Sequence, residues 1–170
     1  PWAIVSFVQV PVALACTPWP RTTPGFPEPA PGEAPSIPDH ELIRQIGEGA
    51  YGQVWLARTV LGTYRAVKIV FRAAFDRDAP FEREYQGIKN FEPISRTHEG
   101  FVDILQVGRN ESAGYFYCVM EVADDCQTGP AFDPATYVPK TLAKEIARRK
   151  PLPLPECLAL GIALAEALER

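Results

Sequence analysis

Three short segments in the first half of the chain have the composition of β-strands. Residues 42–46, 53–58 and 64–70 are rich in β-branched and aromatic side chains, and turn residues separate them. The first turn is the glycine-rich stretch 47–52 (GEGAYG), and the second is 59–62 (TVLG). The pattern therefore predicts two successive hairpins, with the three glycines at the turn of the first.

The glycine-rich turn indicates a place where the backbone approaches a ligand closely. A dinucleotide-binding fold needs a helix directly after such glycines, whereas 53–58 has the composition of a strand. A P-loop needs Gly-Lys-Ser or Gly-Lys-Thr, which does not occur here. At a hairpin, glycines let N–H groups face phosphate oxygens. The alternative is an ordinary glycine-rich hairpin.

Lys68 interrupts an otherwise apolar strand. With the period of two that strands have, Ala66 and Lys68 share one face, and Val67 and Ile69 share the other. A lone strand lysine is more often an exposed edge residue. An unpaired ammonium group inside a sheet is unfavourable, so Lys68 must reach solvent or meet an anion.

Residues 80–91 have the spacing of an amphipathic helix. One side carries Phe81, Glu84, Ile88 and Phe91, and the polar side carries Glu82, Gln86 and Lys89. A carboxylate on the buried side needs a cation, and Lys68 on the preceding strand is the economical partner. Glu82 competes for this role, but its neighbours are polar, so we favour Glu84.

The end of the chain predicts two further helices. Residues 141–150 form one, with Arg148, Arg149 and Lys150 near its C-terminus. The second begins at Pro155 and reaches Arg170 without a glycine cap. Its apolar stripe consists of Leu158, Ile162, Ala165 and Leu168, widened by Leu160 and Leu164. Such a broad stripe needs a packing partner, so we interpret the sequence as a fragment.

The first 38 residues differ in composition from the rest. They hold ten of the 18 prolines, which is typical of an extended tether. The apolar run 2–16 is shorter than the roughly 20 residues of a membrane span. It resembles a secretory apolar region without the basic start, or else unstructured upstream sequence. We therefore divide the chain into 1–38, 39–125 and 126–170.

Composition excludes several classes of protein. A net charge of −4 argues against a nucleic-acid-binding surface. The four cysteines (16, 118, 126 and 157) have no CxxC spacing, which indicates a reducing compartment and a cytoplasmic location. His40 and His98 are the only histidines, and neither stands in a catalytic pattern or predicts a metal site. We expect no membrane association, although 2–16 is apolar.

Taken together, four stretches resemble the N-terminal lobe of protein kinases. They are GEGAYGQV at 47–54, AVKIV at 66–70, the helix with Glu84, and YCVMEVADD at 117–125. The likeness covers roughly 41–126 and is closest to bacterial and eukaryotic-like Ser/Thr kinases. It implies an α+β fold: a five-stranded antiparallel sheet, with 101–108 and 115–121 as its last strands, and one helix. The first helices of an incomplete helical lobe would follow.

The same resemblance implies an ATP site and assigns residues to it. Lys68 would contact the α- and β-phosphates, and Glu84 would hold Lys68. The glycine-rich loop Gly47, Glu48, Gly49, Ala50, Tyr51 and Gly52 would cover the phosphates. Ile46, Val54 and Ala66 would pack on the adenine, Met120 would stand at the back of the pocket, and main-chain groups of Glu121 and Ala123 would bind the adenine edge. Asp124 or Asp125 would lie near the ribose.

The resemblance also has gaps. No His-Arg-Asp, Asp-Phe-Gly or Ala-Pro-Glu segment occurs, so neither a catalytic base nor a metal ligand is assigned, and Mg²⁺ is expected for the full-length protein only. The stretch 126–139 is longer than the usual link at this place. We expect the ATP-binding portion of a Ser/Thr protein kinase, inactive alone, with an unknown protein substrate and with Tyr preference left open. The alternative is a pseudokinase-like module that binds nucleotide or protein.

Overall fold

The computed structural model describes residues 35–49, 51–98, 100–149 and 152–169. Predictions for 1–34, Ala50, Lys150 and the side chain of Leu168 lie outside the described residues. Within the described part, no helix has both the length and the apolar character that crossing a membrane requires.

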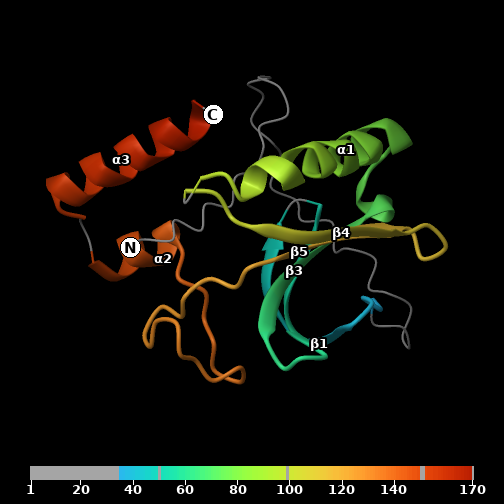
Figure 1. Cartoon of the computed structure of the whole chain (residues 1–170), viewed down its shortest axis with the longest axis horizontal. Coiled ribbons are helices and arrows are strands. Elements are labelled where there is room, and N and C mark those ends of the chain that lie inside the picture. Colours follow the sequence, from blue (N-terminus) through green and yellow to red (C-terminus); the bar gives the residue numbers. More distant parts are fainter. Residues whose placement is uncertain (1–34, 50, 99, 150–151, 170) are drawn as a thin grey trace.

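A five-stranded antiparallel sheet forms the centre of the molecule (Figure 1). Its strands are β1 (His40–Gly49), β2 (Gly52–Thr59), β3 (Tyr64–Phe71), β4 (Ile104–Asn110) and β5 (Tyr115–Met120). Their spatial order is β1-β2-β3-β5-β4, so β1 and β4 are the edges. The five predicted strands and their antiparallel arrangement are confirmed, although β4 covers Ile104–Asn110 rather than the predicted 101–108.

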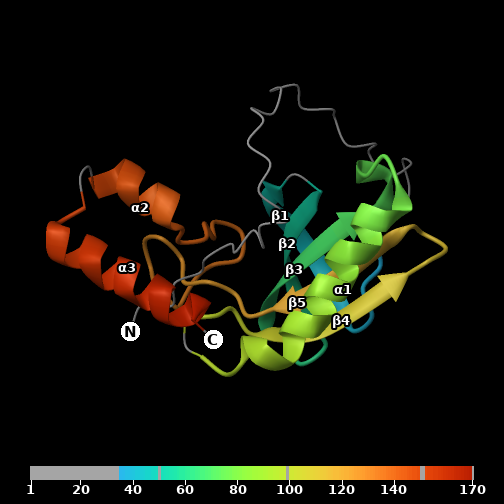
Figure 2. The same cartoon turned by 90° about the horizontal axis from the view of Figure 1, so that it is seen from above.

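Helices follow the sheet on one face and at one end. A short 3₁₀ turn, η1 (Arg72–Ala74), leads from β3 into α1 (Asp78–Ser95), which crosses the sheet. Two further helices, α2 (Leu142–Arg149) and α3 (Leu154–Leu168), lie together away from the sheet (Figure 2). The architecture is α+β, as predicted.

The two faces of the sheet bury different apolar clusters. One face carries Ala57, Val67, Ile69, Tyr117 and Val119. The other face carries Val70 and Phe116, against which Phe81 of α1 packs at 1% exposure. Because β3 residues alternate between the faces, Lys68 shares its face with Val70 and with α1.

Residues 35–38 belong to the folded part, contrary to the predicted boundary at 39. Ile37 is 4% exposed and packs in the cluster of Val67 and Ile69. The Tyr115 hydroxyl donates to the Ser36 carbonyl over 2.7 Å. Proline content predicted an extended segment here, but a single apolar side chain covering the sheet favours order.

An ion pair joins the two C-terminal helices. Arg149 donates two hydrogen bonds to the Glu156 carboxylate, at 2.6 and 2.7 Å. Arg149 lies in the last turn of α2, as predicted, and its side chain also connects α2 to α3. Leu154, Leu158 and Ile162 of α3 are 70%, 58% and 59% exposed.

The stretch between β5 and α2 has a defined fold of its own, built around Asp125. This buried carboxylate accepts hydrogen bonds from the amides of Gln127 (2.8 Å), Thr128 (3.0 Å) and Val138 (2.6 Å). The Cys126 amide also donates to the Val138 carbonyl over 2.9 Å. Residues 124–140, called the 124–140 loop below, are therefore closed into a compact unit by the Asp125 carboxylate together with backbone hydrogen bonds.

The backbone donors hold the pKa of Asp125 down at about 2. Since an unfolded aspartate titrates near roughly 3.9, Asp125 contributes stability above that pH. The contribution is lost as pH falls toward about 2. We predict that wild type is more stable than Asp125→Asn at neutral pH and that the difference shrinks below about pH 4. Urea unfolding at several pH values measures this, and a difference that stays constant down to pH 2 contradicts it.

Candidate functional site

The register of the sheet brings five predicted site residues onto one face. Val54 stands between Gly47 on β1 and Lys68 on β3, and Ala66 pairs with Met120 on β5. Directly paired residues point to the same side of a sheet, as do residues two apart on one strand. The site face, as we call it, thus carries Gly47, Val54, Ala66, Lys68 and Met120.

The space around the three glycines of the hairpin differs, so the need for glycine is not the same at each position. A Cβ at Gly52 would lie 2.1 Å from the Ile69 carbonyl oxygen, so only glycine lets β2 and β3 pair here. A Cβ at Gly47 would meet nothing closer than 3.7 Å, and one at Gly49 nothing closer than 4.0 Å. Sheet packing therefore explains Gly52 and leaves the other two for another role.

Next to the hairpin turn, Tyr51 is fixed by an aromatic contact. Its ring stacks on Phe75 with centroids 4.5 Å apart and planes 14° apart. Phe75 in turn meets Phe81 of α1 at 5.7 Å. Glu48 and Gly49 are exposed, and Ile46 is half-buried beside an irregularity in the β1 register. The described part of the hairpin is thus connected to the start of the helix.

Lys68 is half-buried on the site face and meets no carboxylate of the described residues within 4.0 Å. Its neighbour across the strands is Cys118, which is 2% exposed. Burial raises the pKa of that thiol to about 11, although nearby Lys68 acts in the opposite direction. Cys118 is therefore neutral near pH 7 and gives Lys68 no counter-charge.

The predicted ion pair between Lys68 and Glu84 is not present among the described residues, where Glu84 is half-buried. Glu82, two residues before Glu84, forms an ion pair with Arg109 instead. It accepts two hydrogen bonds from Arg109 of β4, at 2.7 and 2.8 Å. The helical pattern could rank Glu82 and Glu84 by their neighbours, but Arg109 lies 27 residues after Glu82, so the local pattern could not reveal it as the partner.

Arg109 is placed by aromatic rings as well as by charge. Its guanidinium carbon lies 5.4 Å from the ring centres of both Phe81 and Tyr85 on α1. The contact lowers the pKa of Glu82 and raises that of Arg109, with the shared hydrogen bonds as the main cause. This arrangement ties α1 to the edge strand of the sheet.

Local contacts order the residues that follow Met120. The Glu121 amide donates to the Asp103 carbonyl over 3.2 Å, and the Glu121 carboxylate accepts the Asp103 amide at 3.4 Å. The Ala123 carbonyl accepts the Tyr137 hydroxyl at 3.0 Å. Met120 is half-buried and Ala123 is 8% exposed. The predicted adenine-binding stretch therefore has a fixed backbone.

Two residues near the site were not predicted, Arg44 and Tyr137. Arg44 of β1 pairs with Leu56, so it lies on the same side of the sheet as the site face. Its guanidinium donates to the carbonyls of Pro134 (3.0 Å) and Tyr137. Main-chain acceptors in a loop leave no trace in the sequence, which explains the omission. The predicted ribose ligand Asp125 uses its carboxylate within the loop.

A hollow of about 360 Å³ lies between α1 and β4. It is lined by Tyr85, Lys89, Glu92, Leu105, Gln106 and Val107. A smaller one, of about 130 Å³, lies within the 124–140 loop. In the part of the chain that the structure describes, no three His, Cys, Asp or Glu side chains gather as metal ligands would.

Comparison with known proteins adds no relative: no protein-family model matches the chain, and no curated protein matches it.

Glu82 and Glu84 of α1 provide a matched test of what holds the helix to the sheet. We predict that Glu82→Gln lowers the melting temperature by a few degrees, because it breaks the bidentate pair with Arg109. Glu84→Gln, the same change two residues away, should leave it nearly unchanged. Thermal melts followed by circular dichroism measure the melting temperature of each variant. High salt should reduce the difference between the two variants, because it screens the ion pair. A larger loss for Glu84→Gln than for Glu82→Gln contradicts the assignment.

Proposed function

We propose that this chain is the ATP-binding portion of a Ser/Thr protein kinase. The observation that carries the proposal is Lys68, a half-buried cation on the site face without a carboxylate partner among the described residues. An ammonium group in such a place is stabilised by an anion that arrives from outside, and phosphate is a suitable one.

The surroundings of Lys68 suit the other parts of a nucleotide. Gly47 and Gly49 belong to the neighbouring hairpin and leave room above the strand for phosphate oxygens to approach backbone amides. Val54 and Ala66 lie beside Lys68 on the site face, at 4% and 8% exposure, and are the apolar side chains against which a flat base would pack. Main-chain groups at Glu121 and Ala123 would then fix the edge of the base.

In this proposal the chain binds and orients ATP. Lys68 would hold the α- and β-phosphates, and the hairpin amides would hold the remaining oxygens. Transfer of the γ-phosphoryl group to a protein hydroxyl also needs a base and a metal, which neutralises charge on the phosphates when bound. The 170 residues contain no motif for either, so transfer is proposed for the full-length protein only.

A second candidate is a module that binds nucleotide or protein without transferring phosphate. The ion pairs of α1 favour this candidate, because the lysine–glutamate pair expected of a kinase is not formed. Glu84 makes no ion pair with Lys68, and Glu82 is paired with Arg109. Coding sequence beyond Arg170 separates the two candidates. A His-Arg-Asp segment followed by Asp-Phe-Gly supports the kinase, and a stop codon supports the binding module.

The central prediction is that Lys68→Met weakens ATP binding. A charge-assisted contact to phosphate contributes about 1.5–3 kcal/mol, so the affinity should fall by roughly tenfold or more. Lys144→Met, which removes an exposed lysine of α2, is the matched control and should leave the affinity unchanged. Calorimetric titration of the 170-residue chain with ATP measures all three proteins, and thermal melts confirm that they are folded.

Equal ATP affinities for wild type and Lys68→Met, with both proteins folded, contradict the phosphate contact. If ATP binds to neither protein at millimolar concentration, the nucleotide site itself is refuted.

A further inference from the structure

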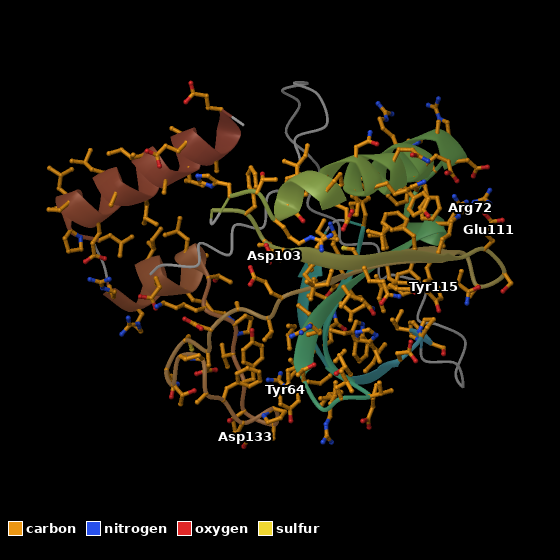
Figure 3. The ribbon with its side chains drawn as sticks, in the orientation of Figure 1. Tyr64, Arg72, Asp103, Glu111, Tyr115 and Asp133 are labelled. Carbon is orange, nitrogen blue, oxygen red and sulfur yellow. The ribbon has the colours of Figure 1, made fainter. Side chains whose placement is uncertain are left out.

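The 124–140 loop folds back against the sheet at one end of the site face. Figure 3 shows Tyr64, at the start of β3, close to Asp133 of the loop. The ring of Tyr64 meets Phe132 at 5.4 Å, and Phe132 meets Tyr137 at 4.4 Å. Because Tyr64 and Ala66 are two apart on β3, these aromatic rings stand next to the proposed base-binding surface.

Arg44 holds the loop to the opposite edge of the same surface. It is the β1 residue in the row of Leu56, Ala66 and Met120. Its hydrogen bonds to the Pro134 and Tyr137 carbonyls connect β1 directly to the loop. A charged donor on two main-chain acceptors fixes the backbone itself, whatever the side chains do.

Tyr137 provides a third attachment, at the proposed adenine-binding stretch. It is 1% exposed, and its hydroxyl donates to the Ala123 carbonyl. Burial raises the pKa of this hydroxyl, with the charges of Asp125 and Asp124 acting in the same direction, so it remains a donor at neutral pH. The loop is thus attached to β1, β3 and residue 123 at once.

The carboxylate of Asp125 forms its hydrogen bonds within the loop and is not offered to a ligand. The loop therefore acts on a bound nucleotide by limiting the space beside it. A base held at 121–123, with its phosphates at Lys68, leaves the ribose as the part nearest the loop. We propose that the 124–140 loop is a fixed wall of the nucleotide site, attached by Arg44 and Tyr137, which excludes nucleotides with bulky ribose substituents. This inference rests on the proposed ATP site.

The test compares ATP with 2′/3′-O-(N-methylanthraniloyl)-ATP, which carries an aromatic group on the ribose. Wild-type chain should bind the substituted nucleotide roughly tenfold or more weakly than ATP. Arg44→Ala frees the loop from β1 and should bring the two affinities close together, with the ATP affinity itself little changed. Arg83→Ala, which removes an exposed arginine of α1, should keep the wild-type ratio.

Tyr137→Phe removes only the hydroxyl and should also reduce the ratio of the two nucleotide affinities. This variant provides the test if Arg44→Ala does not fold. The proposed role of the loop is contradicted if wild type binds the two nucleotides equally, or if neither variant changes the ratio of their affinities. Either result leaves the proposed ATP site intact. If wild type binds neither nucleotide, the proposed function fails and the wall fails with it. In Lys68→Met, both affinities should fall together.

Discussion

A half-buried ammonium group on an apolar strand is the constraint around which this molecule is arranged. Lys68 lies on β3, where most of the neighbouring residues of the same strand are buried. No carboxylate of the described residues forms an ion pair with it. Partial removal of an ammonium group from water without a counter-charge is unfavourable. Folding alone therefore leaves an attractive position for an anion, beside two glycines whose missing side chains keep the approach open.

The helix that packs near this position is held by a different charge. Arg109 contacts Glu82 with both arms of its guanidinium and lies over two aromatic rings of α1. Since β4 is an edge strand, this pair connects the helix to the rim of the sheet rather than to its centre. The site and the attachment of the helix are therefore electrostatically separate in this conformation.

Much of the fold could be predicted because the strands obey local rules. Alternation at Ala66 and Lys68 identified the site face, and the glycine turn identified the first hairpin. The amphipathic spacing found α1, although the helix extends from Asp78 to Ser95 rather than over 80–91. These features depend on neighbours within a few residues.

What could not be predicted depends on distant or main-chain partners. Arg109 meets Glu82 across 27 residues, and Arg44 meets the Tyr137 carbonyl across 93. The sequence of side chains does not indicate which main-chain carbonyls accept hydrogen bonds, so the attachment of the 124–140 loop to Arg44 could not be predicted. Ile37 was assigned to the unstructured segment because prolines surround it, whereas its burial depends on strands that follow much later.

The aromatic series Tyr51, Phe75 and Phe81 has a mechanical consequence. Tyr51 is next to the turn of the hairpin, Phe81 is buried under α1, and Phe75 touches both. A displacement of the hairpin that separates Tyr51 from Phe75 removes one of the two rings between which Phe75 packs. A movement of the hairpin therefore changes the packing of Phe75, and through Phe75 the packing of Phe81 on the helix.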